Sequence, residues 1–236
     1  MEAHYVGSEL ELFAEAHHWK RYWASRLQPW LGQRILDVGA GLGATARAFA
    51  AHRFERYLAL EPDPELAGRI RTAVTAGDLP RGVEVQAGTT ADLDPEARFD
   101  TVLYVDVLEH IADDRGELER VAKHLETSGR IIVLAPAHAW LYSPFDAAVG
   151  HVRRYTRVSL AAAKPTALEQ ESMFYLDSVG LLASTANRWL LKASMPSPAQ
   201  IRLWDGVMVP ASRVLDPLLF HSVGKTVVGV FRRPLS

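Results

Sequence analysis

The sequence predicts an α/β fold, a doubly wound and mostly parallel seven-stranded sheet with a helical cap. Short apolar runs alternate with helical segments along the first 136 residues, as expected when crossover helices join parallel strands. The run at 99–105 is mostly apolar, which is typical of a strand covered on both faces. The length of 236 residues suits one large domain.

The individual elements are predicted from hydrophobic spacing and from helix start and stop signals. Pro64 favours the first turn of a helix, and the segment 127–129 (Thr-Ser-Gly) predicts the end of another. The segment 137–155, rich in aromatic and basic side chains, is predicted to be a long functional loop. Strands are expected at 34–38, 56–60, 83–86, 99–105, 130–135, 168–176 and 226–231, and helices at 8–30, 43–51, 64–76, 114–125, 157–164, 178–192 and 198–220, the last interrupted by Pro210.

Composition and charge exclude several classes of protein. Hydrophobic residues make up 48% of the chain and charged residues 23%, which excludes a disordered or fibrous protein. The absence of cysteine excludes disulfides, thiolate metal sites and cysteine nucleophiles. A net charge of −2 provides no basic field, so no nucleic-acid partner is expected. The first residues do not form a signal peptide and no apolar run is long enough to cross a bilayer. We therefore expect a cytoplasmic protein with no membrane span.

The most informative segment is 35–43, where a strand, a glycine turn and a helix are expected in succession. Glycines permit a tight turn and let a ligand approach backbone N–H groups at the helix N-terminus. Gly39, Gly41 and Ala44 satisfy the G-x-G-x-x-G/A pattern of dinucleotide sites. Asp37, followed by Gly39, Gly41 and Gly43, satisfies the pattern of sites for a nucleoside sulfonium. Because a carboxylate repels a pyrophosphate and attracts an ammonium or sulfonium, Asp37 favours the second class.

A second acid, Glu61, ends the following strand. A carboxylate there can accept both hydroxyls of a ribose, so Glu61 supports an adenosine-type ligand in either class. The alternative is a surface acid at a strand end.

The sequence resembles the class I S-adenosylmethionine-dependent methyltransferases. The resemblance rests on the glycine loop, on Glu61, on the adenine-side loop 88–93 and on the fourth strand and its exit at 99–111. It implies a Rossmann-like methyltransferase fold and S-adenosylmethionine as the cofactor. It also implies a single domain (1–236) made of an N-terminal helical lid (1–32), a cofactor-binding core (33–136), an acceptor-binding cap (137–220) and a final strand (221–236).

By this resemblance, the cofactor site takes residues from the lid and from four strand ends. Many family members have an aspartate at the position of Thr89, and threonine can still offer an acceptor to the exocyclic amine of adenine. For the aromatic residues of the lid, the alternative is an amphipathic helix face packed on the sheet; for Asp106, it is a loop cap formed with Asp113 or Asp114. The predicted cofactor-binding residues are Tyr5, Trp19, Tyr22, Asp37, Gly39, Ala40, Gly41, Gly43, Glu61, Pro62, Thr89, Thr90, Asp106 and Val107.

His110 is the candidate catalytic base. It lies just after the fourth strand, and the stretch 107–110 resembles that of ubiquinone-type O-methyltransferases. The unperturbed pKa of a histidine, about 6.5, suits proton transfer from an acceptor hydroxyl. The alternative is that His110 only orders its loop.

The segment after the fifth strand is predicted to bind the acceptor, and it resembles a loop of bacterial enzymes of glycan and secondary-metabolite pathways. Two adjacent arginines suggest an anionic acceptor. The alternative is that Arg154 pairs with Asp146 as scaffold while Arg153 is solvated. None of the nine histidines shows metal-ligand spacing, so no metal is expected. The predicted acceptor-binding residues are His138, Tyr142, His151, Arg153, Arg154 and Tyr155.

These inferences predict an enzyme that methylates an oxygen or nitrogen of a small molecule and acts as a monomer or homodimer. The apolar stretch 214–220 is interpreted as core packing or a dimer contact. Two other function classes stay open: a nicotinamide-dependent oxidoreductase using the same glycine loop, and a noncatalytic cofactor-binding partner subunit. A local arginine patch at 153–157 keeps a nucleic-acid methyltransferase as a further alternative.

Overall fold

The computed structural model describes residues 13–186 and 196–235. Its strands are β1 (Arg34–Val38), β2 (Arg56–Glu61), β3 (Val83–Ala87), β4 (Phe99–Val105), β5 (Leu125–Pro136), β6 (Glu169–Leu176) and β7 (Thr226–Arg232). They form one sheet in the order β3-β2-β1-β4-β5-β7-β6. The first five strands are parallel, and β7 is antiparallel to both of its neighbours. The predicted seven-stranded, mostly parallel sheet is therefore confirmed.

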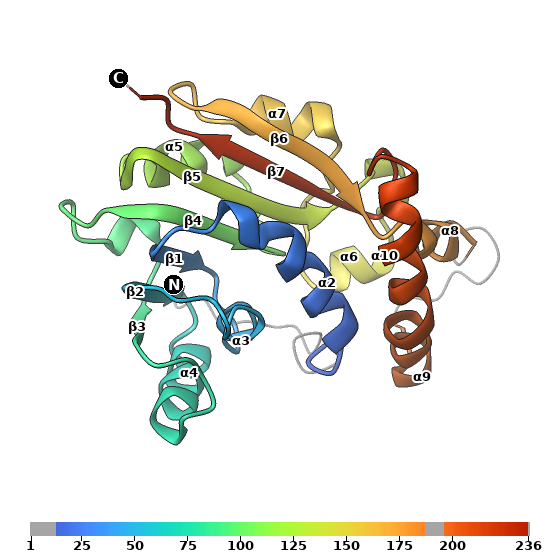
Figure 1. Cartoon of the computed structure of the whole chain (residues 1–236), viewed down its shortest axis with the longest axis horizontal. Coiled ribbons are helices and arrows are strands. Elements are labelled where there is room, and N and C mark those ends of the chain that lie inside the picture. The colour runs from blue at the N-terminus through green and yellow to red at the C-terminus, as the bar shows by residue number, and fades with distance from the viewer. Residues whose placement is uncertain (1–12, 187–195, 236) are drawn as a thin grey trace.

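Helices cover both faces of this sheet (Figure 1). The helices are α2 (His17–Leu27), α3 (Ala44–Ala48), α4 (Pro64–Ala76), α5 (Asp114–Ala122), α6 (Pro144–Ala148), α7 (Arg157–Ala163), α8 (Ser178–Ala186), α9 (Pro198–Leu203) and α10 (Val209–Leu218). Successive residues of a strand point to opposite faces, so Ile35 belongs to one buried cluster and Leu36 to the other. Buried residues of α2, α3, α4, α9 and α10 belong to the first cluster, and those of α5 and α7 to the second.

Short-range hydrogen bonds explain where several helices begin. The Asp63 carboxylate accepts from the backbone N–H groups of Glu65 and Leu66 at the start of α4, where Pro64 needs no hydrogen-bond partner. The Asp113 carboxylate accepts from Gly116 N–H at the start of α5. That bond assigns the predicted loop cap to Asp113 rather than to Asp106.

The predicted helix stop at 127–129 is wrong, because these residues lie within β5. The helix already ends at Ala122, where the Arg233 guanidinium donates to the carbonyls of Ala122 and Leu125. Leu125 is buried and pairs with Phe99, so the chain enters the sheet at once. The next pair is Thr101 with Arg130, and the extra residues between the two pairs belong to β5. The stop signal therefore marks an irregularity of the strand.

The predicted break at Pro210 is also misplaced. Pro210 stands in the first turn of α10, and the irregularity is the π-helical turn Trp204–Met208 before it. Within that turn, the Asp205 carboxylate accepts from the backbone N–H groups of His18 and Trp19. The turn thus caps the N-terminal end of α2 with a residue far away in sequence.

The other predicted elements agree with the structure with small shifts at their ends. The predicted helix 8–30 appears as α2 followed by the 3₁₀ turn Gln28–Trp30, and its first residues, including Tyr5, lie outside the described part. The predicted helix 178–192 is described as far as Ala186. The predicted long loop 137–155 contains the 3₁₀ turn Ala139–Leu141 and α6.

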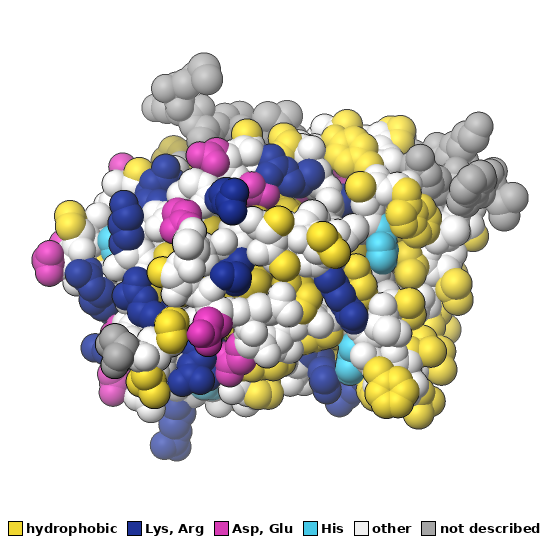
Figure 2. Space-filling model, turned by 90° about the horizontal axis from the view of Figure 1, so that it is seen from above, with side chains coloured by type: hydrophobic (Ala, Val, Ile, Leu, Met, Phe, Trp, Pro, Cys, Tyr) yellow, Lys and Arg dark blue, Asp and Glu magenta, His cyan; other side chains and the backbone are white. Residues whose placement is uncertain are grey.

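Several apolar side chains of the stretch 214–220, at the end of α10, are exposed rather than buried in the core. Val214, Leu218 and Phe220 are 65%, 69% and 89% exposed, so the predicted core packing of this stretch is wrong. Figure 2 shows hydrophobic side chains gathered toward the end of the molecule that carries α10. Within the described residues, no helix has the length and apolarity needed to span a bilayer.

Candidate active site

The segments that follow β1, β4 and β5 meet at one edge of the sheet and line a cavity of about 2060 Å³. The spatial order places β1 between β2 and β4, which is the point where an open α/β sheet offers a ligand crevice. The turns after β1, β4 and β5 line the cavity, and α2 and residues 200–208 contribute to its walls. Because β7 is antiparallel, its first residue, Thr226, pairs with the last residue of β5 and lies at the same edge.

The glycine loop lines this cavity through Gly39, Ala40 and Gly41. Gly39, Gly41 and Gly43 have positive φ angles of 67°, 56° and 72°, which strain any residue with a Cβ. A Cβ atom on Gly39 would also lie 2.7 Å from Cγ2 of Val107. The loop therefore exposes its backbone to the cavity at the glycines, and the side chain of Val107 packs against Gly39.

Glu61 stabilises the loop. Its carboxylate accepts from Gly41 N–H at 2.7 Å and from Asp63 N–H at 2.9 Å, and burial raises its pKa. Neither Glu61 nor the exposed Pro62 belongs to the cavity lining. Each carboxylate oxygen keeps a second lone pair, so binding of ribose by Glu61 stays a prediction, as does the role of Pro62.

Asp37 does not reach the cavity. Its side chain is 1% exposed and accepts a hydrogen bond from the Tyr57 hydroxyl at 2.9 Å. Burial, aided by the charge of Glu61 and opposed by the Tyr57 hydrogen bond, raises the pKa of Asp37 to about 7. Asp37 therefore has a hydrogen-bond partner within the sheet. The geometry does not support its predicted contact with a cation in the cavity.

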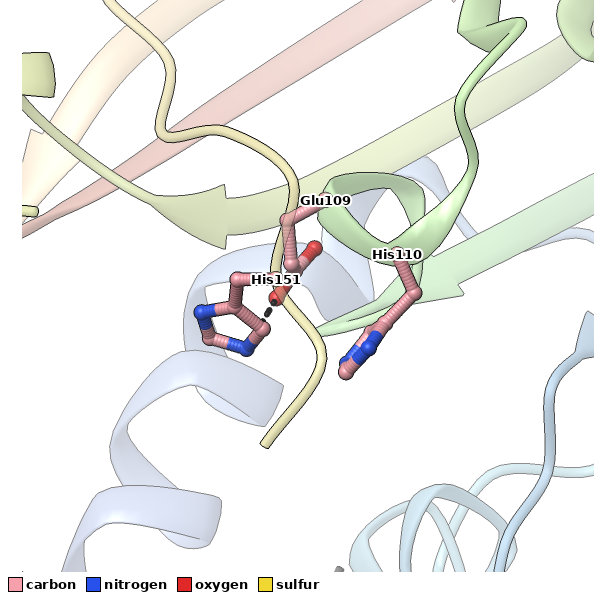
Figure 3. A group of neighbouring side chains, drawn as sticks. All are labelled: Glu109, His110 and His151. Carbon is pink, nitrogen blue, oxygen red and sulfur yellow. Dashed lines mark ion pairs between the residues drawn. The ribbon is translucent and has the colours of Figure 1, made fainter. Parts of the chain in front are cut away.

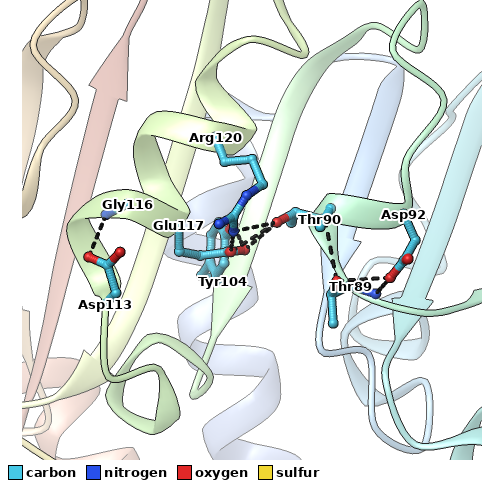
Figure 4. A network of polar contacts seen from close by, with 9 residues as sticks. Thr89, Thr90, Asp92, Tyr104, Asp113, Gly116, Glu117 and Arg120 are labelled. Atoms are coloured by element: carbon cyan, nitrogen blue, oxygen red, sulfur yellow. Dashed lines mark hydrogen bonds and ion pairs between the residues drawn. The ribbon is translucent and has the colours of Figure 1, made fainter.

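The adenine-side loop is also held by internal contacts (Figure 4). Thr89 caps its turn by donating to Asp92 and accepting from Ala91 N–H. The buried Thr90 hydroxyl lies 2.9 Å from both carboxylate oxygens of Glu117, which also accepts from Tyr104 at 2.8 Å. Neither threonine lines the cavity. Their polar groups stabilise the loop, and their predicted contact with the cofactor stays untested.

The aromatic residues of α2 have separate roles. Trp19 lines the cavity and contacts Trp204 with ring centroids 5.7 Å apart. Tyr22 turns away and donates to Asp216 of α10 at 2.7 Å. Trp23 packs edge-on against Phe49, which agrees with the alternative of an amphipathic helix face.

The turn after β4 brings three ionisable side chains to the cavity. Asp106 has a positive φ of 55°, a strained backbone that occurs frequently at functional sites. Burial raises the pKa of its carboxyl group, and the charges of His151 and Lys225 oppose this shift. Glu109 and His110 follow in the 3₁₀ turn Leu108–His110. Burial and the neighbouring His151 lower the pKa of His110 to about 4, so this imidazole is neutral and weakly basic at neutral pH.

In the segment after β5, two of the six predicted acceptor residues, His151 and Arg154, line the cavity. Arg154 forms two parallel hydrogen bonds with the Asp146 carboxylate at 2.8 and 3.0 Å. His151 Nδ1 lies 2.8 Å from the same carboxylate. The alternative that pairs Arg154 with Asp146 is therefore confirmed, and this pair supports His151.

The other four residues contact the protein instead. Their partners are the Gly224 carbonyl for His138, the His151 carbonyl for Tyr142, Asp114 and the Ala112 carbonyl for Arg153, and Asp114 for Tyr155. Arg153 is thus ion-paired rather than solvated, which corrects the second half of the alternative. None of these four belongs to the cavity lining, so the geometry gives no support for an anionic pocket made by the arginine pair.

Glu109 and Lys225 are two of the cavity residues that the sequence patterns do not single out. Glu109 lies in the stretch 107–110 that carries the resemblance, and both it and His110 line the cavity. Lys225 lines the cavity 3.4 Å from Asp177 Oδ2 and 3.8 Å from the centre of the Trp204 ring. No local pattern marks Lys225, because only the antiparallel pairing of β7 brings it to this edge.

Comparisons with known proteins agree with this architecture. A family model described as a methyltransferase domain matches residues 15–199. A ubiquinone biosynthesis O-methyltransferase of Rhodopseudomonas palustris (strain HaA2) is 27% identical over 175 residues, 70% of this chain and 68% of the relative. A demethylmenaquinone methyltransferase of Tropheryma whipplei (strain Twist) is 29% identical over 140 residues, 53% of this chain and 51% of the relative.

Among solved structures, a geranyl diphosphate methyltransferase in complex with SAM has a TM-score of 0.64 and 15% identity. The likeness covers 96% of this chain and 90% of that one. At this identity the likeness demonstrates a shared fold. The chain spans about two thirds of the Rhodopseudomonas relative and about half of the Tropheryma relative.

Proposed function

The chain belongs to the methyltransferase-domain family, and from this premise we propose that it transfers a methyl group to an oxygen or nitrogen of a small molecule held in the cavity. Its cofactor is S-adenosylmethionine, and the alternative of a nicotinamide-dependent oxidoreductase is wrong, because the family model and the named relatives are methyltransferases. The observation that carries the proposal is the size and position of the cavity. A ligand pocket has a volume of roughly 300–1,000 Å³, so about 2060 Å³ leaves room for an acceptor beside the cofactor.

The residues present fit the cofactor. The loop at Gly39, Ala40 and Gly41 presents backbone to the cavity at a place where a Cβ would collide with Val107. Trp19 provides an aromatic wall nearby, and an aromatic face attracts a cationic group such as a sulfonium. When bound, S-adenosylmethionine supplies a methyl carbon activated by its sulfonium.

The protein's own contribution is to bind, orient and exclude water. Bringing the acceptor atom and the methyl carbon into line contributes about 7–11 kcal/mol to lowering a bimolecular barrier when the geometry is right. The aromatic and apolar walls, among them Trp19, Phe145 and Trp204, keep water away from the reacting atoms. The neutral His110 offers a nitrogen lone pair at the same edge.

Among the basic residues that line the cavity, we assign recognition of an anionic acceptor to Lys225, because Asp146 already binds Arg154 in two hydrogen bonds and Arg153 lies outside the lining. Asp177, its nearest acid, already accepts from Trp204 Nε1 at 2.7 Å and Ser212 Oγ at 2.6 Å. The ammonium group of Lys225 therefore keeps donors for a ligand in the cavity. Asp106 also faces the cavity and can accept a hydrogen bond from an acceptor hydroxyl or amine.

A glycine pair tests the proposed site. Gly39→Ala places a methyl group against Val107 and strains the loop, so it should abolish binding of S-adenosylhomocysteine in calorimetry and all product formation. Gly68→Ala, in α4, adds a methyl group with no atom within 4 Å and is the matched control. Methyl transfer is measured by mass spectrometry over a panel of hydroxyl and amine acceptors. Equal binding by both variants would refute the placement of the cofactor, and a wild-type protein that binds cofactor but methylates no acceptor would refute the proposed activity.

A further inference from the structure

Three metal-ligating side chains converge at the cavity wall. One donor atom each of Glu109, His110 and His151 can be chosen so that all lie within 4.8 Å of one another. Figure 3 shows Glu109 and His110 coming from the turn after β4 and His151 from the segment that passes beside it. All three residues line the cavity. No spacing in the sequence marks this set, because the two histidines are separated by 41 positions (151 minus 110).

A backbone hydrogen bond joins the two segments, because the Val152 N–H donates to the Glu109 carbonyl at 2.8 Å. Within the segment after β5, the Tyr142 hydroxyl donates to the His151 carbonyl at 2.7 Å and fixes the backbone beside the imidazole. The rings of His110 and His151 meet edge-on, with centroids 4.7 Å apart. The three side chains are therefore placed by the fold and not by chance rotamers on a surface.

Glu109 is the unusual member of the group. Its side chain is fully buried, and neither carboxylate oxygen accepts a hydrogen bond from another described residue. His151 Nε2 lies 3.8 Å from Glu109 Oε1, which is beyond hydrogen-bond length. A buried carboxyl group without a partner is costly, so this arrangement calls for a ligand that binds oxygen and nitrogen together.

His151 is oriented for such a ligand by a second carboxylate. Asp146 lies 2.8 Å from His151 Nδ1 and is itself held by Arg154 and by Ser143 N–H. With the proton on Nδ1, the lone pair of Nε2 is directed toward Glu109. A carboxylate behind a histidine in this way is the usual second support of a metal-ligating imidazole.

We propose that Glu109, His110 and His151 bind one divalent transition-metal ion at the wall of the acceptor cavity. Two imidazoles and one carboxylate suit ions such as Zn²⁺, Fe²⁺ and Co²⁺, and three protein ligands leave positions open toward the cavity. Ligand atoms at about 2.1 Å from one ion lie roughly 3 to 3.5 Å apart, so the 3.8 Å between His151 and Glu109 closes with small side-chain rotations.

The role of the ion rests on the proposed function. A divalent ion at this wall binds an acceptor oxygen, lowers its pKa and fixes its direction. The hydroxyl proton passes to solvent, the new oxygen–methyl bond forms, and the methyl–sulfur bond of the donor breaks. His110 then acts as a ligand of the ion rather than as the base of the reaction.

Metal binding can be measured without cofactor or acceptor. The full-length protein, dialysed against a chelator, is titrated with Co²⁺ while its visible d–d absorption is followed, and with Zn²⁺ in a calorimeter. We expect one ion per chain, loss of binding in Glu109→Gln and His151→Ala, and affinity about 10- to 100-fold weaker in Asp146→Asn. His17→Ala removes an exposed histidine from the same cavity but not from the cluster, and should bind like wild type.

The outcomes separate this proposal from the proposed function. No stoichiometric binding by wild type, or equal binding by wild type, Glu109→Gln and His151→Ala, overturns the metal site. Methyl transfer that continues undiminished in chelator overturns the role of the ion. Stoichiometric binding that is lost in Glu109→Gln and His151→Ala supports the site, even if no acceptor is methylated. In that case it is the proposed methyl transfer that fails. Thermal unfolding shows that each variant is folded, and the near-isosteric Glu109→Gln provides the test if a histidine variant does not fold.

Discussion

Replacing Tyr22 by phenylalanine separates an anchoring role of α2 from a cofactor contact. The Tyr22 hydroxyl donates to Asp216 at 2.7 Å, and the two side chains are 2% and 0% exposed. A hydrogen bond to a charged group contributes about 1.5–3 kcal/mol. For a chain of this size, 1 kcal/mol shifts Tm by about 2–4 °C, so Tyr22→Phe should lower Tm by about 3–12 °C.

Calorimetry and ligand titration check this prediction together. Differential scanning calorimetry measures the loss of stability, and titration with S-adenosylhomocysteine should give an unchanged affinity, because Tyr22 does not line the cavity. Tyr175→Phe is the matched control. Within 13–186 and 196–235, its hydroxyl takes part in one hydrogen bond, accepted from the Arg157 N–H at 3.2 Å, so the loss of stability should be smaller. An unchanged Tm in Tyr22→Phe, or weaker ligand binding at full stability, would refute the reasoning and favour a lid.

Three further predictions follow from buried polar groups. Because burial raises the pKa of Asp37 to about 7, the folded state binds a proton that the unfolded state releases near pH 3.9. The free energy of unfolding should therefore fall by up to about 4 kcal/mol as pH rises from 4 to 7. Urea titrations should show a smaller fall in Asp37→Asn, and an identical pH profile would contradict this. Glu117→Ala leaves the buried hydroxyls of Tyr104 and Thr90 without their acceptor and should cost about 2–6 kcal/mol. Under conditions in which this variant is folded, it should bind S-adenosylhomocysteine as tightly as the wild type does. Weaker binding under those conditions would support the predicted contact between Thr90 and the cofactor. For an acceptor found in the panel that carries a carboxylate, Lys225→Met should raise KM about tenfold or more, while an uncharged analogue of that acceptor should be unaffected. Equal effects on both acceptors would exclude recognition of the carboxylate by Lys225.

The parts of the protein that the sequence predicted best depend on local physics. The alternation of strand and helix patterns can be followed within short stretches of sequence. The turn after β1 needs residues with positive φ angles at positions 39, 41 and 43, and glycine is the residue that adopts them without strain. The resemblance carried by these motifs agrees with the family match. Residues that follow parallel strands lie at one edge of a sheet. Four of the predicted residues follow β1 or β4 and line the cavity as this rule predicts: Gly39, Gly41, Asp106 and His110.

Side-chain direction was harder to predict than position. Asp37 and Thr90 stand in the predicted segments, but a buried tyrosine and a buried glutamate, respectively, bind their polar groups. Arg153 was expected beside the acceptor, and Asp114 pairs with it instead. In each case, the deciding partner lies at least 20 positions away in sequence, and burial makes an unpaired polar group costly enough to turn it toward that partner.

The sequence by itself determined the class of sheet, the glycine loop and the cofactor edge, because short-range patterns and the geometry of parallel strands specify them. Only the tertiary structure decided which charged groups face the cavity. Antiparallel β7 brings Lys225 beside the end of β5, and the docking of segment 150–152 on the turn after β4 places His151 next to Glu109 and His110. Those placements depend on long-range pairing and on hydrogen bonds that buried polar groups must form, and no local pattern in the chain records them.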